Sequence, residues 1–275
     1  MLDNARCIAN NRLYSAREFS ELEPKDISKL RRSLICNGCG NEAFFRVASP
    51  PRRGPCFGAR PHKEGCSEAT TDAGMWGLPG SGEQEERIFN SAGRIVISLS
   101  DVKPDSMEVE EQEKSDRFQG ARRSFGLSEG ATTNVTRRVL KTLLSRLFTN
   151  PEFRFSDTAL TLPEGRGETT VRDFFVSFDQ VEERAIGEFK GVWGLITDAS
   201  YDRNGDLWLN TGDKSTVSFV VEEALVPEFM QLLKVQDLED LSGAQALILI
   251  SVRRSSGNKV YGSIHDLRLL ALSLA

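Results

Sequence analysis

The sequence predicts an α+β protein with an N-terminal metal-binding module, a middle α/β element and a C-terminal five-stranded β-barrel. Four of the five cysteines and one of the two histidines fall between residues 36 and 66. Apolar residues recur at helical spacing over residues 135–148. Residues 189–275 form the pattern of three strands, a helix and two strands. The predicted parts are the module (1–70), a mobile acidic linker with one strand (71–131), a helix-plus-hairpin element (132–188) and the barrel (189–275).

The composition favours a protein without a membrane span. The chain of 275 residues has a net charge of −5 and is 39% hydrophobic, so part of it is expected to remain unpacked. It has no apolar run of about eighteen residues, and its first residues lack the layout of a secretion signal. We therefore expect a cytoplasmic protein. Basic residues concentrate at 31–63 and 122–146, so a local basic surface can meet nucleic acid although the whole chain is acidic.

The cysteine cluster has the spacing of a zinc site. Cys36 and Cys39 form a Cys-x2-Cys pair across a glycine-containing turn, and His62 and Cys66 provide a second pair. Structural zinc takes four such ligands in a tetrahedron, which leaves no position for water. The sequence therefore predicts a structural Zn²⁺ held by these four residues. Cys56 is either a spare thiol or an alternative ligand, and the other interpretation of the cluster is a set of free thiols in a small core.

The middle element contains one clear helix. A polar cap at residues 132–134 precedes the apolar stripe, and Asn150-Pro151 ends it. Two strands, at 159–162 and 171–178, are predicted to follow as a hairpin around a glycine-containing turn. An isolated strand is expected at 94–99, within the linker.

The barrel follows an element order that is widely used for binding. The predicted strands are 189–197, 207–210, 216–221, 246–252 and part of 259–272, with a helix at 222–233. This order resembles the oligonucleotide/oligosaccharide-binding (OB) fold, in element order and turn placement. Gly191 and Gly194 suit the strongly bent first strand of such a barrel.

The resemblance to an OB fold implies a set of binding residues. OB barrels that bind single strands use aromatic rings as stacking platforms and cations for the phosphates. The expected nucleic-acid-binding residues are Trp193, Tyr201, Trp208, Lys214, Arg253, Arg254, Lys259 and Tyr261 on the barrel, with Arg52 and Arg53 on the module. The alternatives are that the tryptophans are buried against the middle element and that Arg253 and Arg254 form a solvated hairpin tip.

Residues 5–66 resemble the N-terminal part of the bacterial competence-protein CoiA family. Leu34-Ile35-Cys36-Asn37-Gly38-Cys39-Gly40 matches the Cys-x2-Cys segment of that family, while Cys56-Phe57 and Pro61-His62 loosely match its histidine-containing element. The chain departs from the family at Cys56, which stands where the family has histidine, and it lacks the acidic-plus-lysine pattern of the nuclease domain that often follows there. The resemblance therefore implies a role near DNA in bacteria and carries over no cutting activity.

These patterns favour binding over catalysis. His265 and Asp266 are adjacent, but no motif places a serine or cysteine nucleophile beside them. We expect a non-enzymatic protein of a bacterial or mobile-element DNA-handling system that binds nucleic acid, with single-stranded DNA preferred. A protein partner is a further expectation. The alternatives are a protein–protein adaptor in a DNA-processing complex and a divergent nuclease.

Overall fold

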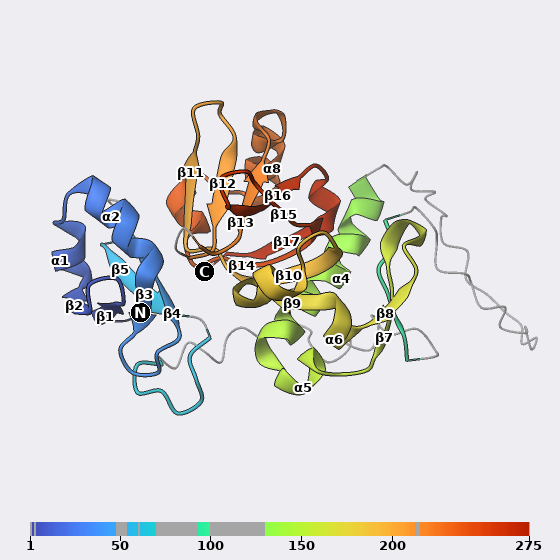
Figure 1. Ribbon diagram of the computed structural model, residues 1–275, viewed down its shortest axis with the longest axis horizontal. Helices are drawn as coiled ribbons and strands as arrows, with labels where there is room; N and C mark the ends of the chain where they lie inside the picture. Colours follow the sequence, from blue (N-terminus) through green and yellow to red (C-terminus); the bar gives the residue numbers. More distant parts are fainter. Residues whose placement is uncertain are drawn as a thin grey trace, which may run out of the picture.

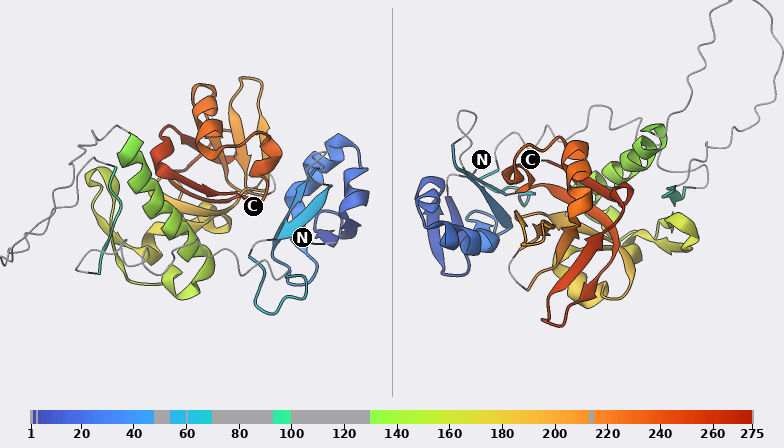
Figure 2. Two further views of the ribbon diagram at one scale, coloured as in Figure 1. Left: turned by 180° about the vertical axis from the view of Figure 1, so that it is seen from behind. Right: turned by 90° about the horizontal axis from the view of Figure 1, so that it is seen from above.

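The protein has a mixed α+β fold (Figure 1). The computed structural model describes residues 2, 4–47, 54–59, 61–69, 93–99, 130–212 and 215–274. Within these ranges the strands form four sheets, of five, four, five and three strands. The N-terminal module lies at one end of the molecule and the three-stranded sheet at the other (Figures 1 and 2). None of the helices in these ranges is long and apolar enough to cross a membrane.

The N-terminal module, residues 2–69 as far as described, is built on an antiparallel sheet in the order β2-β1-β3-β4-β5. Its elements are β1 (Asn4–Cys7), β2 (Arg12–Ser15), α1 (Ala16–Ser20), α2 (Pro24–Leu30), β3 (Leu34–Cys36), β4 (Glu42–Arg46) and β5 (Cys56–Ala59). Phe19, Phe45 and Phe57 are fully buried, with ring centroids 4.8 to 5.5 Å apart. These rings form the centre of a core that is small for a folded unit.

The middle helix shares a core with strands from the C-terminal part. Helix α4 (Gly130–Thr149) ends at Asn150, whose side chain caps α5 (Pro151–Arg154) by accepting a hydrogen bond from the Phe153 amide at 3.0 Å. The buried face of α4 packs on a sheet in the order β17-β14-β10-β9. Its strands are β9 (Phe175–Ser177), β10 (Phe189–Leu195), β14 (Gln245–Ser251) and β17 (Leu270–Ser273). Leu140, Leu143, Leu144 and Leu147 are the fully buried leucines of this face.

A hairpin forms after α5, but its second strand is 168–170, and the predicted second strand, 171–178, is wrong. Strand β7 (Ala159–Thr161) pairs with β8 (Glu168–Thr170), and β6 (Ile95–Val96) adds to β7 in parallel. Residues 171–178 do not continue β8, because the Thr170 side chain caps a helical turn, α6 (Val171–Phe174). The chain then enters β9 in the sheet under α4 and forms the short helix α7 (Val181–Arg184).

The second five-stranded sheet has the order β11-β12-β13-β16-β15. Its elements are β11 (Asp198–Tyr201), β12 (Leu207–Asn210), β13 (Ser218–Val221), β15 (Arg253–Arg254) and β16 (Val260–Ile264), with α8 (Val226–Leu233) after β13. The pair β13 and β16 is parallel, and the other neighbours are antiparallel.

The expected barrel differs from this arrangement, because no sheet in the described ranges closes on itself. The predicted first strand, 189–197, is found as β10 and ends at Leu195; the chain divides there from β11, which the sequence does not predict as a strand. At the division, the Ile196 amide donates to the Ala244 carbonyl at 2.9 Å, and the Thr197 amide donates to the Asn210 carbonyl at 2.8 Å. Neighbouring residues thus bond to the residue just before β14 and to the last residue of β12, which belong to different parts of the fold. The predicted fourth strand, 246–252, is found as β14, and the two-residue strand β15 follows it; the predicted fifth strand is divided into β16 and β17.

The N-terminal module contacts the C-terminal part directly. The Arg31 guanidinium donates to both carboxylate oxygens of Glu239 at 2.8 Å, and Arg46 Nε donates to the Ser242 carbonyl at 2.8 Å. Most of the predicted linker over 71–131 lies outside the described residues, apart from 93–99 and the first residues of α4.

Candidate functional site

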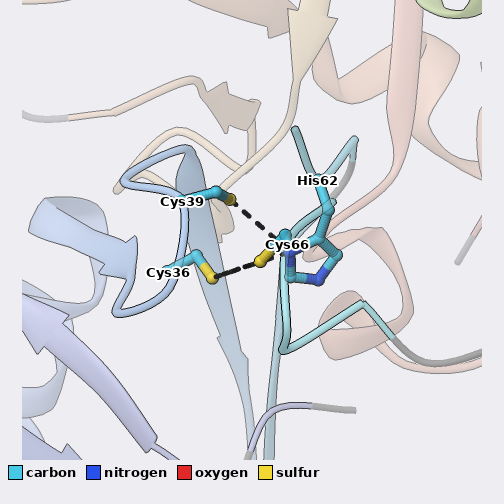
Figure 3. Close-up of side chains that lie close together, drawn as sticks. All are labelled: Cys36, Cys39, His62 and Cys66. Carbon is cyan, nitrogen blue, oxygen red and sulfur yellow. Dashed lines mark hydrogen bonds between the residues drawn. The ribbon is translucent and has the colours of Figure 1, made fainter. Parts of the chain in front are cut away.

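Four ligand-type side chains of the N-terminal module meet at one point. Cys36 ends β3, Cys39 lies in the turn that follows, and His62 and Cys66 come from the segment after β5. Figure 3 shows His62 and Cys66 facing the two cysteines of the turn. All four ligand atoms lie within 4.8 Å of one another. This Cys3His group is the set of residues that the sequence predicts as metal ligands.

Three of the six distances among the ligand atoms match those of a tetrahedral metal site. The Sγ atoms of Cys36 and Cys39 are each 3.6 Å from His62 Nδ1, and Cys36 Sγ is 3.9 Å from Cys66 Sγ. In a tetrahedron with zinc-type bond lengths, the S···N edges are about 3.6 Å and the S···S edges about 3.8 Å. The Cys3His group could therefore hold a metal ion with little rearrangement.

The local backbone explains why these residues meet. The Gly40 amide donates to the Cys36 carbonyl at 2.9 Å, with Gly40 at a φ of 73° that favours glycine. The Asn41 side chain donates to the Pro61 carbonyl at 2.7 Å and so ties this turn to the segment that carries His62. A Cβ at Gly38 would lie 3.0 Å from Cys66 Sγ, so glycine there lets the turn lie close to the second ligand pair without a tight contact.

The two cysteines of the turn differ in acidity. Burial raises the pKa of Cys36 to about 11. Burial also acts to raise the pKa of Cys39, but the amides of Lys63 and Asn41 and the side chains of His62 and Cys36 outweigh it and lower the pKa to about 6. The backbone thus stabilises a thiolate at Cys39, which is the form that binds a metal. Cys56, the alternative ligand, lies in β5 outside the Cys3His group.

A second candidate site is a groove of about 600 Å³ over β12. It lies between the loop that joins β11 to β12 and the loop that joins β15 to β16. The residues that line this β12 groove are Arg32, Ser200, Tyr201, Asp202, Trp208, Asn210, Ser215, Gly257, Asn258 and Lys259. Tyr201, Trp208 and Lys259 among them are predicted binding residues.

Aromatic rings gather at the β12 groove. Tyr201 is 50% exposed, which leaves its ring available for stacking. The half-buried Trp208 donates its indole N–H to Asp202 Oδ2 at 3.2 Å, and its ring centroid lies 6.3 Å from that of Tyr261. The Arg253 guanidinium lies 5.0 Å from the Tyr261 ring centroid. The structure thus brings Tyr201, Trp208, Tyr261 and Arg253 into one neighbourhood.

The remaining predicted cations differ in their surroundings. Lys259 donates to the Thr216 carbonyl at 2.6 Å while lining the groove. Arg254 donates to Glu182 at 2.7 Å and to Asn258 at 2.9 Å. Lys214, Arg52 and Arg53 lie outside the described residues.

Trp193 is not among the groove residues. Its ring packs edge-on against Phe148 of α4, with centroids 5.1 Å apart, and the Arg154 guanidinium lies 4.9 Å from its centroid. This position corresponds to the alternative in which a tryptophan packs against the middle element. Conversely, sequence reasoning missed Arg32 and Asn210 as groove residues, because no local pattern places them there.

The fold and the Cys3His group define a class: a mixed α+β protein with a cysteine–histidine group that could hold a metal ion. No protein-family model and no curated protein matches the chain. The resemblance of residues 5–66 to the CoiA family therefore stays a prediction.

Proposed function

We propose that the protein binds single-stranded nucleic acid, preferentially DNA, in the β12 groove, and that it holds this ligand without transforming it. The observation that carries the proposal is the group of aromatic and cationic side chains around one groove. Tyr201 and Trp208 offer ring faces on which bases can stack, and Lys259 and Arg32 offer charge for the backbone. Stacking of this kind contributes about 1–3 kcal/mol per base and does not require a particular sequence.

The strand connectivity supports this choice of ligand. We propose that β10 with β11, and β14 with β15, are two bent strands of one OB-like unit. Strand β11 pairs with β12, β12 with β13, β13 with β16, β16 with β15, and β14 with β10. In OB folds, the second and third strands and the loops after the first and fourth strands form the binding face. The β12 groove occupies the corresponding place.

We also propose that the ion of the Cys3His group is a structural Zn²⁺. Thiolate and imidazole donors in a tetrahedral set suit zinc, and four protein ligands leave no position for water. When bound, the ion would contribute folding free energy to a module with a small core. The proposed setting, a bacterial or mobile-element DNA-handling system, rests on the resemblance of residues 5–66 alone.

The test is binding of a short fluorescein-labelled oligothymidine, followed by fluorescence anisotropy in a series of salt concentrations. We expect the binding constant to fall steeply with salt, because the bound strand releases counterions. A double-stranded oligonucleotide of the same length is expected to bind more weakly. Absence of binding, together with salt-insensitive capture of a protein partner, would favour the adaptor alternative. Magnesium-dependent cleavage of either oligonucleotide would favour the nuclease alternative.

A further inference from the structure

The β12 groove is not formed by the C-terminal strands alone. Arg32, in the short 3-10 turn Arg31–Ser33 of the N-terminal module, is one of its lining residues. Its side chain is 20% exposed. A residue from a distant part of the chain therefore contributes to the site in which we propose that the nucleic acid binds.

Asp198 holds Arg32 in this position. Arg32 donates through Nη2 to Asp198 Oδ2 at 2.6 Å and through Nε to the same oxygen at 3.2 Å. Asp198 is buried at the start of β11, and it also accepts a hydrogen bond from the side chain of Asn210, another groove residue, at 3.4 Å. These bonds use Nε and Nη2 of Arg32. Among the residues that the structure describes, no bond to Arg32 Nη1 is found, so this nitrogen can donate to a ligand.

Arg31 fixes the same turn against the C-terminal part. Its guanidinium is buried and donates to Glu239, to the Phe45 carbonyl at 2.7 Å and to Ser242 Oγ at 3.1 Å, and it lies 3.3 Å from Asp198 Oδ1. Bidentate pairing of this kind sets the orientation of an arginine. Arg31 therefore bonds the turn that carries Arg32 both to the module itself, through Phe45, and to the C-terminal part, through Glu239 and Ser242.

The Cys3His group includes Cys36, which lies at the other end of the segment 31–36. The turn Arg31–Ser33 leads directly into β3, and the last residue of β3 is Cys36, one of the ligands. Strand β3 lies between β1 and β4 in the sheet, so its position follows that of the whole module. An ion at the Cys3His group fixes one end of residues 31–36, and the contacts of Arg31 and Arg32 fix the other.

We infer that Arg32 contacts the backbone phosphate of the bound strand and that metal binding at the Cys3His group sets its position. This inference rests on the proposed function. Arginine suits the role because one edge of its planar guanidinium can bond a carboxylate while another nitrogen bonds a phosphate. Metal and nucleic acid are then linked ligands: each strengthens the binding of the other by the same factor.

The experiment uses the full chain with zinc bound, labelled oligothymidine and fluorescence anisotropy. Wild type and Arg32→Gln are compared before and after zinc is removed with EDTA and the chelator is dialysed away. We expect the Arg32→Gln change to weaken binding roughly tenfold, as for loss of a hydrogen bond to a charged group. Removal of zinc should weaken wild type by a similar factor, and re-addition of Zn²⁺ should restore binding. In Arg32→Gln, removal of zinc should have little further effect.

The matched control is Arg17→Gln, which removes the same charge from an exposed arginine of the same module. It should keep the wild-type affinity and the wild-type response to zinc. If wild type binds but zinc removal has no effect, or has the same effect in Arg32→Gln, the linkage through Arg32 is wrong while the proposed function stands. If zinc-bound wild type does not bind the oligonucleotide at all, the proposed function fails, and the inference fails with it.

Hydrogen exchange provides a readout that needs no ligand. Removal of zinc from wild type should raise exchange at the amides of 31–36 and also at 197–200, on the other side of the contact. Increased exchange confined to the N-terminal module would overturn the inference even if zinc removal weakened binding. Circular dichroism of Arg32→Gln distinguishes loss of the phosphate contact from loss of folding.

Discussion

The indole of Trp208 is oriented by its hydrogen bond to Asp202 and remains half-buried at the β12 groove. Replacement by alanine removes a stacking face and leaves the strand pairing of β12 intact. We expect Trp208→Ala to lower the affinity for single-stranded oligonucleotide by roughly tenfold, within the range known for one stacked base. Fluorescence anisotropy measures this loss directly.

Phe155 is the matched control for this change. It is 74% exposed and lies just after α5, away from the residues that line the groove. Phe155→Ala should therefore leave the affinity unchanged. Equal affinities for wild type and Trp208→Ala, in a protein that binds the oligonucleotide, would remove Trp208 from the site.

Trp193 and Trp208 show what single residues reveal before the structure is known. Both lie in strands with apolar neighbours, and the same alternation predicts an exposed indole for both. The difference arises from α4, a helix more than forty residues earlier in the chain, which covers the face of β10 that carries Trp193. Strand periodicity indicates two faces, but it does not indicate which face a distant helix covers.

At the scale of elements, the Cys3His group gives the clearest prediction. Cys36→Ser removes a thiolate ligand at the end of β3, so the protein should lose its bound metal. Because the module has a small core, residues 4–69 should become sensitive to limited proteolysis while the sheets under α4 stay folded. Mass spectrometry of the metal content and of the proteolytic fragments measures both effects.

Cys56→Ser tests the alternative ligand. Cys56 lies in β5 outside the Cys3His group, so this variant should keep a full equivalent of metal. If Cys36→Ser keeps the metal and Cys56→Ser loses it, Cys56 and not Cys36 is the ligand. That result would contradict the site described above.

The Cys3His group and the central helix were accessible to sequence reasoning because their signals are local. The Cys-x2-Cys spacing and the leucine stripe of α4 are each contained in a short stretch of sequence. The change of sheet after the predicted first strand is not a local feature. It depends on Ile196 and Thr197 bonding to two different partners, Ala244 and Asn210, and these pairings follow from the tertiary fold. The sequence therefore predicts β10 but not β11, which belongs to the other sheet.

At the scale of the whole molecule, the sequence suggested two tethered units, and the structure adds a direct contact between them. The contact includes Arg31. In the sequence, Arg31 is one of several basic residues of its segment, and nothing in the neighbouring sequence sets it apart from the others. Its partner Glu239 lies 208 positions away. Charge patterning along the chain identifies basic segments, but only the fold determines which arginine of a segment becomes buried.

Arg31→Ala therefore tests whether the molecule behaves as one unit. The change removes the arginine bonded to Glu239 and one of the two arginines paired with Asp198, and breaking a buried ion pair in this way costs about 3–5 kcal/mol. Thermal unfolding followed by calorimetry should show a lower midpoint and, because the contact is weakened, a separate transition for the N-terminal module. Arg17→Ala, which breaks the exposed pair with Glu21, should cost at most about 1 kcal/mol and leave the unfolding profile unchanged. If Arg31→Ala unfolds as wild type does, the bonds of Arg31 do not couple the two parts.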